Sequence, residues 1–262
     1  MPVETASFVG KEKIGTVCVL RMNRPPSNNL NVDFLRQLRG LFREAAQDRD
    51  TRCLLLASAL PKYFSAGMDI DAIINLPLER RFEPFGELLD LYREITLFPK
   101  PSIAAINGYA FLGGWIMAMG FDFRYLAQEN GKIALSEIKM GISPTTMLIR
   151  AMTAMAAKQS LVKEMVFTGK TLLAQEALDG GFVDKLIPKD SLHEESLREA
   201  QRLAELPMHA YAMVKKSYKE ALLGNLEADI KKSKEEFLSL ISGPEAQEGF
   251  KAMQEKRRPK FI

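Results

Sequence analysis

Short apolar runs and longer amphipathic stretches alternate along the first 190 residues of the chain. The runs at 16–22, 53–57 and 103–106 are short and mostly apolar, which is typical of buried strands. We expect the first of them to pair with residues 7–9 as a hairpin, across a turn near Gly15. This alternation predicts an α/β fold up to about residue 190.

Helical spacing of apolar residues predicts the elements between these strands. From Asn31, a predicted N-cap, apolar residues recur at Phe34, Leu38, Leu41 and Ala45. They predict an amphipathic helix of about four turns. Further predicted elements are a covering loop at 76–86, a helix within 78–98, helices at 145–157, 158–167 and 173–178, and a strand at 182–187.

Beyond Pro188 the strand pattern ends and helical spacing continues to the end of the chain. The third of these helices carries an apolar stripe, which we expect to pack on the body of the protein or on another subunit. We therefore divide the chain into an alternating β/α core, 1–190, and a C-terminal helical region, 191–262. The four predicted helices are 190–205, 208–223, 225–241 and 244–256.

Net charge, the N-terminal sequence, the length of apolar stretches and the cysteines together argue against several classes of protein. The net charge is only +3, and basic residues are interspersed with acidic ones, so we expect no nucleic-acid partner. The first residues lack the basic start of a signal or transit peptide, and no stretch approaches the ~20 apolar residues of a membrane span. Cys18 and Cys53 lie in apolar runs, as buried free thiols do. We therefore expect a cytoplasmic protein with no membrane partner.

Two glycine turns follow the central strands. Gly67 lies in the turn after the strand at 53–57, and Gly113 and Gly114 open a helix after the strand at 103–106. Unpaired backbone N–H groups at such turns can bind negative charge, and parallel strands would bring both turns to the same end of a sheet. The alternative is that the glycines only allow close packing of helix on strand. A phosphate-binding loop does not fit, because Gly114 and Trp115 stand where a Lys and a Ser or Thr are needed. A dinucleotide fingerprint does not fit either, because it needs a tighter glycine spacing after a strand.

The remaining polar residues restrict the chemistry. The two histidines, His193 and His209, lie in the helical tail, and no nucleophile elbow is present. No cluster has metal-ligand spacing, so no metal is expected. Backbone donors and a carboxylate remain, and together they can hold a carbonyl oxygen as it becomes an enolate while an acid group moves the α-proton.

Several motifs resemble the crotonase (enoyl-CoA hydratase/isomerase) superfamily along nearly the whole chain. The matching segments are 23–25 (NRP), 64–70 (FSAGMDI), 103–110 (IAAINGYA) with Gly113-Gly114, 122–124 (DFR), Ser136-Glu137, Gly141-Ile142, Thr168-Gly169 and 174–187.

The resemblance implies a spiral of ββα turns that binds acyl-CoA thioesters, followed by a helical trimerisation region. Coenzyme A would enter only as part of the substrate, with no other cofactor, and the assembly would be a homotrimer or a dimer of trimers. The resemblance also implies an oxyanion hole from the backbone N–H groups of Met68 and Gly113. The implied substrate-binding residues are Arg24, Ala66, Gly67, Met68, Asp69, Ile70, Gly113, Trp115 and Ile116.

One departure from the family pattern narrows the expected reaction. Hydratases of this family carry two glutamates; here the first position is Ile116, while Glu137 matches the second. A double-bond shift needs one base, which removes a proton from C2 and returns it at C4. This pattern is similar to that of monofunctional Δ3,Δ2-enoyl-CoA isomerases, with Glu137 as catalytic base. Trp115 and Leu112 either shape the acyl pocket or belong to the core, and Asp69 is expected to cap a helix.

Two alternatives remain open from the sequence. The first is another reaction of the family, such as hydration, hydrolysis or dehydration, using a second carboxylate from Asp69, Asp71 or Glu87. The second is a binding subunit without catalytic activity.

Overall fold

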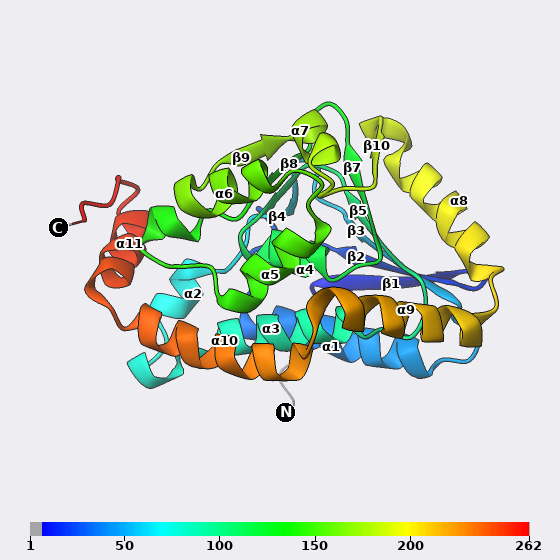
Figure 1. Cartoon of the computed structure of the whole chain (residues 1–262), viewed down its shortest axis with the longest axis horizontal. Helices are drawn as coiled ribbons and strands as arrows, with labels where there is room; N and C mark the ends of the chain where they lie inside the picture. The colour runs from blue at the N-terminus through cyan, green and yellow to red at the C-terminus, as the bar shows by residue number, and fades with distance from the viewer. Residues whose placement is uncertain (1–6, 262) are drawn as a thin grey trace.

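The structure, a computed structural model, describes residues 7–261 apart from the side chain of Leu78. Two sheets form its centre (Figure 1). The larger has the strand order β1-β2-β3-β5-β7-β10 and the smaller the order β4-β6-β8-β9. The strands are β1 (Val9–Ile14), β2 (Val17–Met22), β3 (Cys53–Ser58), β4 (Tyr63–Ser65), β5 (Ser102–Ile106), β6 (Tyr109–Phe111), β7 (Phe123–Ala127), β8 (Lys132–Ala134), β9 (Thr171–Leu173) and β10 (Lys185–Ile187).

The helices alternate with these strands and then continue alone. They are α1 (Val32–Gln47), α2 (Ile70–Ile74), α3 (Glu83–Thr96), α4 (Gly113–Met119), α5 (Thr146–Met155), α6 (Gln159–Thr168), α7 (Ala174–Asp179), α8 (Leu192–Ala204), α9 (Met208–Leu223), α10 (Leu226–Ile241) and α11 (Pro244–Gln254), with 3-10 turns at η1 (Leu78–Arg80), η2 (Glu137–Met140) and η3 (Lys189–Ser191).

The strands of the larger sheet pair as the apolar runs of the sequence predict. β1 and β2 form the expected antiparallel hairpin, with Val9 opposite Met22, and β2, β3, β5 and β7 are parallel neighbours. Successive residues of a strand face opposite sides of the sheet. Leu54 and Leu56 therefore join the main core, whereas Cys53 and Leu55 face a second core. Both cysteines are buried free thiols, as expected.

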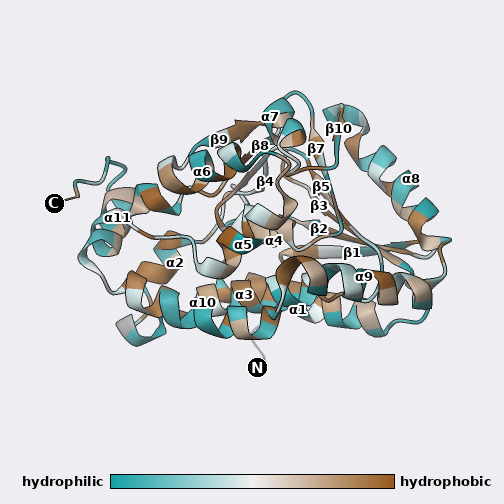
Figure 2. Ribbon diagram, in the orientation of Figure 1, coloured by the Kyte–Doolittle hydropathy of each residue, from teal (hydrophilic) through white to brown (hydrophobic). Residues whose placement is uncertain are grey.

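Helices cover both faces of the larger sheet. The main core lies between the sheet and α1, α3 and α4, and the second core is closed by α8 through Leu192, Ala200 and Leu203. In Figure 2 the strands are mostly hydrophobic, and α8 and α10 carry both hydrophilic and hydrophobic segments, as amphipathic helices do. No helix within residues 7–261 is long and apolar enough to cross a membrane.

The predicted covering loop at 76–86 is partly wrong. The segment contains η1, and α3 begins within it at Glu83, with Pro84 in the first turn. Proline is tolerated there because the first N–H groups of a helix have no partner inside the helix.

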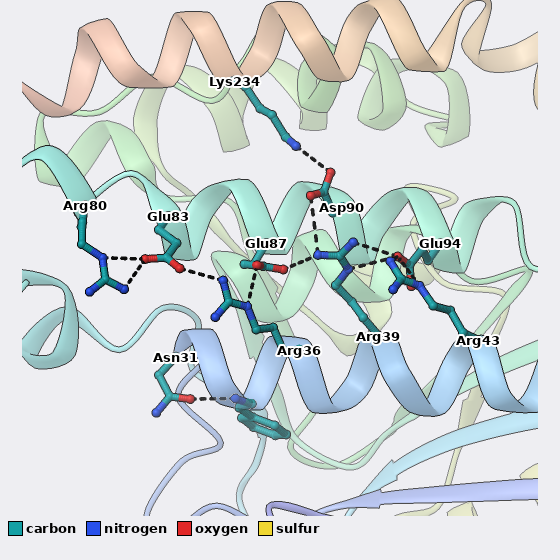
Figure 3. Close-up of polar contacts among 11 residues, drawn as sticks. Asn31, Arg36, Arg39, Arg43, Arg80, Glu83, Glu87, Asp90, Glu94 and Lys234 are labelled. Atoms are coloured by element: carbon teal, nitrogen blue, oxygen red, sulfur yellow. Dashed lines mark hydrogen bonds and ion pairs between the residues drawn. The ribbon is translucent and has the colours of Figure 1, made fainter. Parts of the chain in front are cut away.

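The four C-terminal helices and the helix after Asn31 are confirmed, and Asn31 caps α1 by accepting from the Phe34 N–H at 2.9 Å (Figure 3).

Ion pairs connect α1, α3 and α10 along one side of the molecule (Figure 3). Arg36 pairs with Glu83 and Glu87, and Arg39 with Glu87 and Glu94. The row continues to α10 through Asp90, which pairs with Lys234 at 2.6 Å. The row joins α10 directly to α3.

Candidate active site

The two glycine turns lie side by side. β4 and β6 are parallel neighbours, so the turns that follow them leave the smaller sheet at the same end. Gly67 has φ +103°, and a Cβ placed on it would lie 3.3 Å from the Gly113 nitrogen. A Cβ on Gly113 would lie 3.2 Å from the Met68 sulfur. Glycine at these positions permits this close approach, as expected for paired backbone donors.

The backbone N–H groups of Met68 and Gly113 donate to no protein acceptor within the described residues. Their neighbours hold them in place: the Leu30 N–H donates to the Gly67 carbonyl at 2.8 Å, and the Asp69 N–H donates to the Leu30 carbonyl at 3.0 Å. Leu112, with φ 50°, donates to the Ala134 carbonyl at 2.9 Å. Fixed, unpaired donors of this kind can stabilise a developing oxyanion without reorganising.

A small cavity of about 50 Å³ lies against both turns. Its polar groups are few, and most of its wall is aliphatic or aromatic. Met68 and Gly113 contribute from the turns, and Glu137 contributes from η2. The remaining lining residues are Ile70, Ile73, Arg81, Phe85, Leu88, Leu112, Ile116, Met140, Ile142, Phe237, Ile241 and Phe250.

Glu137 is the one carboxylate among the described residues that line this cavity. The residue as a whole is half-buried, but its Oε2 atom is buried and has no hydrogen-bond partner in the described chain. Loss of water around the carboxyl group disfavours its charged form, which raises the pKa of Glu137 to about 8. A carboxyl group in this environment is suited to exchanging protons near neutral pH.

Ile116 lines the same cavity and is 2% exposed. It places an aliphatic side chain where the resemblance would put the first glutamate of a hydratase. Trp115, expected at the substrate, does not line the cavity within the described chain. It lies in the core, edge-on to Phe182, with a ring-centroid distance of 6.4 Å. Leu112, by contrast, does line the cavity.

Arg24 and Asp69 support the first glycine turn. They form an ion pair at 2.6 Å, and Arg24 also donates to the Asn29 carbonyl at 2.8 Å. Asp69 caps α2 by accepting from the Ala72 N–H at 3.0 Å, as expected. Ala66 is tied to the Ser27 carbonyl by its N–H at 3.0 Å. These contacts fix the turn that carries the Met68 amide.

The other carboxylates considered as a second acid or base lie outside the cavity lining. Asp69 is engaged by Arg24, and Asp71 is exposed. Glu87 is held by Arg36 and Arg39 in the row of ion pairs between α1 and α3 (Figure 3).

The C-terminal helices supply part of the site, which the sequence did not reveal. Phe237 and Ile241 come from α10, and Phe250 comes from α11. Phe237 and Ile241 belong to the apolar stripe noted in the sequence, but no local motif connects that stripe with Glu137. Only the folded chain brings these residues together.

A larger cavity, of about 430 Å³, lies between α5, α9 and β7 and shares no lining residue with the first. Its Asp122 accepts from Lys215 at 2.8 Å and from Tyr211 at 3.1 Å. This carboxylate is therefore already engaged by neighbouring side chains. No group of His, Cys, Asp or Glu within the described residues is arranged to hold a metal ion.

Comparison with known proteins gives the family of the chain. The sequence model of the family described as enoyl-CoA hydratase/isomerase matches residues 12–262. The chain belongs to the enoyl-CoA hydratase/isomerase family. Mitochondrial enoyl-CoA hydratase of Pongo abelii is 34% identical over 253 residues, covering 95% of this chain and 84% of the relative.

Two further members of the family extend the comparison. The 2,3-dehydroadipyl-CoA hydratase of Escherichia coli K12 is 31% identical, covering 94% of each chain. The crystal structure of an enoyl-CoA hydratase from Mycobacterium avium subsp. paratuberculosis K-10 has a TM-score of 0.85 at 25% identity, covering 98% of this chain and 100% of that one. The α/β crotonase-like fold with C-terminal helices is thereby confirmed.

Proposed function

We propose that this family member is an enoyl-CoA isomerase that shifts the double bond of a 3-enoyl-CoA to give a 2-trans-enoyl-CoA. The observation that carries the proposal is the pairing of Glu137 with Ile116 in one cavity. Within the described residues, the cavity wall offers one carboxylate and, at Ile116, no group that could hold or split a water molecule. A double-bond shift requires only that one group.

In the proposed reaction, the Glu137 carboxylate removes a proton from C2 of the bound thioester. The electrons move onto the thioester oxygen, where the N–H groups of Met68 and Gly113 stabilise the dienolate. Glu137 then returns the proton at C4, so that the double bond lies between C2 and C3 and the carboxylate is regenerated. Removing one oxyanion donor typically costs ~3–4 kcal/mol of barrier.

Hydration of a 2-enoyl-CoA is the second candidate. It is favoured by the names of the relatives, since both curated proteins described above are hydratases. Hydration needs a held water and two proton transfers, and Ile116 offers no second acid or base. Asp69 and Glu87, proposed from the sequence as substitutes, are ion-paired elsewhere.

The decisive test is Glu137→Gln, assayed for conversion of 3-hexenoyl-CoA to the conjugated 2-enoyl thioester by ultraviolet absorbance. We expect a loss of ~10²–10⁴-fold in kcat, because the amide cannot accept the proton. Asp71→Asn is the matched control, since it neutralises an exposed carboxylate on α2. Full activity of Glu137→Gln, or wild-type hydration of crotonyl-CoA faster than isomerisation, would contradict the proposal.

We also propose that the enzyme is cytoplasmic, uses no cofactor beyond the coenzyme A of its substrate, and forms a homotrimer or a dimer of trimers. The exposed apolar residues of α9 support the assembly: Met213, Val214 and Tyr218 are 55%, 68% and 61% exposed. Apolar clusters of this kind on a helix face are typical of protein–protein interfaces.

A further inference from the structure

Two aromatic rings close the cavity on the side of α3 and α10. Phe85 of α3 and Phe237 of α10 are stacked, with ring centroids 3.5 Å apart and an interplanar angle of 16°. They are 6% and 8% exposed, and both line the cavity that contains Glu137. An acyl chain that extends toward α10 from the thioester must therefore stop at these rings or displace them.

Polar contacts on two sides hold Phe237 in this position. On the α3 side, Lys234 pairs with Asp90 and Glu227 pairs with Arg93, each at 2.6 Å (Figure 3 shows the first). On the α5 side, Glu236 accepts from the Thr146 N–H at 2.9 Å and from its hydroxyl at 2.7 Å. Because α10 is anchored to both helices, Phe237 forms a fixed wall.

The free volume in front of this wall is small. The cavity measures about 50 Å³, and the stacked rings of Phe85 and Phe237 bound it on the side of α3 and α10. The Arg81 guanidinium keeps its charge, but its donors are directed to the Ile74 and Leu76 carbonyls at 2.8 and 3.2 Å, and the other lining residues apart from Glu137 are apolar. The cavity therefore suits a short hydrocarbon chain.

We propose that Phe237, stacked on Phe85, is the residue that limits the substrate to short apolar acyl chains. The inference rests on the proposed acyl-CoA reaction, but it does not depend on which reaction of the family the enzyme catalyses. A smaller side chain at position 237 admits longer chains.

The test measures binding of saturated butanoyl-, hexanoyl- and decanoyl-CoA by titration calorimetry, because these ligands bind without reacting. We expect the wild-type enzyme to bind decanoyl-CoA at least ~10-fold more weakly than butanoyl-CoA, since the longer chain meets the rings. In Phe237→Ala the difference should fall to about threefold or less. Leu238→Ala is the matched control, because Leu238 is the next residue of α10 and is 52% exposed; its length profile should equal that of the wild type.

A second variant keeps the test usable if Phe237→Ala does not fold. Phe237→Leu keeps an apolar side chain that is smaller than the ring, and thermal unfolding shows whether each variant is folded. If Phe237→Ala does not fold, narrowing of the length difference by about threefold in Phe237→Leu supports the proposal.

Two results would overturn the length limit alone: wild-type decanoyl-CoA binding as tight as butanoyl-CoA binding, or folded Phe237 variants with an unchanged length profile. In either case 3-enoyl-CoA isomerisation and its loss in Glu137→Gln would still stand. Failure of every acyl-CoA to bind would overturn this inference together with the proposed function.

Discussion

Burial and chemistry act on the same group at Glu137. Its Oε2 atom receives no hydrogen bond within the described chain, so the carboxylate form is not stabilised as it would be in an ion pair. Asp69, whose neighbours Met68 and Ile70 line the same cavity, is by contrast ion-paired with Arg24 at 2.6 Å. This contrast supports the roles that we propose, proton transfer for Glu137 and support of the turn for Asp69.

The raised pKa of Glu137, about 8, predicts the pH dependence of the reaction. A base must be deprotonated to act, so kcat/KM should rise with pH, by ~10-fold per unit below pH 8, and level off above it. A profile that is already flat above pH 5 would contradict this assignment. Rates of 3-enoyl-CoA isomerisation between pH 5.5 and 9.5 give the profile, with an unrelated assay of folding at each pH as control.

The raised pKa of Glu137 also makes the stability of the protein depend on pH. Because the folded-state pKa lies above the unfolded value, the contribution of Glu137 to the free energy of unfolding is fully present below about pH 4.5 and is lost as the pH rises through about 8. Glu137→Gln removes the titrating group and should therefore remove this loss of stability. The free energy of unfolding of the variant should therefore fall less between pH 6 and 9 than that of the wild type.

At the scale of single residues, the sequence revealed the turns but not the whole cavity. Gly67 and Gly113 could be singled out because glycine at a turn has few other uses, and Asp69 because caps have a local signature. Glu137 could be chosen only through the family resemblance, since its pattern also fits a surface carboxylate. Phe237 could not be found, because nothing local connects it with residues 100 positions earlier in the chain.

At the scale of elements, close packing of α4 on β4 holds the site together. A Cβ on Gly114 would lie 2.4 Å from the Ser65 carbonyl oxygen, closer than any normal contact. Since β4 leads into the turn of Met68 and α4 begins with Gly113, their spacing sets the spacing of the two amides.

Gly114→Ala should therefore lower both stability and kcat. We expect a cost of ~1–3 kcal/mol in the free energy of unfolding, as for other overpacked positions, and at least ~10-fold in kcat, as for a misplaced catalytic group. Chemical denaturation and the isomerase assay measure these effects. Gly40→Ala is the control: Gly40 lies in α1 with nothing within 4 Å of an added Cβ, and its replacement should stabilise the protein by ~0.5–1 kcal/mol. Equal effects of the two substitutions would contradict the argument.

Long or strongly patterned elements were predictable, and very short ones were not. The amphipathic helices α1, α9 and α10 begin within about two residues of their expected positions, because apolar spacing and capping residues mark them. β4, β6, β8 and β9 have three residues each, too few to show an alternating pattern. The smaller sheet therefore could not be predicted from periodicity, and the resemblance implied only a spiral of ββα turns.

At the scale of the whole molecule, the C-terminal region returns to the body of the same chain. Lys215 of α9 pairs with Asp122 at 2.8 Å, next to the start of β7, and α10 lies along α3 (Figure 1). The side of α9 that carries Met213, Val214 and Tyr218 remains exposed. In this arrangement α10 lines the candidate site through Phe237 and Ile241, and we propose the exposed apolar residues of α9 as the contact with another subunit.

The proposed assembly can be tested on that surface. Size-exclusion chromatography with light scattering should give about three or six times the chain mass of 29.4 kDa for the wild type. Val214→Asp, which places a charge on the exposed apolar side of α9, should lower the mass. Lys216→Asp, an exposed change elsewhere on the same helix, is the control. A wild-type mass of one chain would contradict the assembly.

The residues of α10 and α11 that line the cavity of Glu137 couple two properties, the length of substrate that fits and the basicity of the carboxyl group. The rings of Phe85 and Phe237 line the same cavity as the Glu137 carboxyl group, and burial of that group raises its pKa to about 8. Any substitution that enlarges this cavity for a longer substrate should also let water reach the carboxylate, which lowers its pKa and makes it a weaker base. Substrate range and proton affinity are therefore coupled, and substitutions in α10 can change the basicity of a carboxylate about 100 residues earlier in the chain.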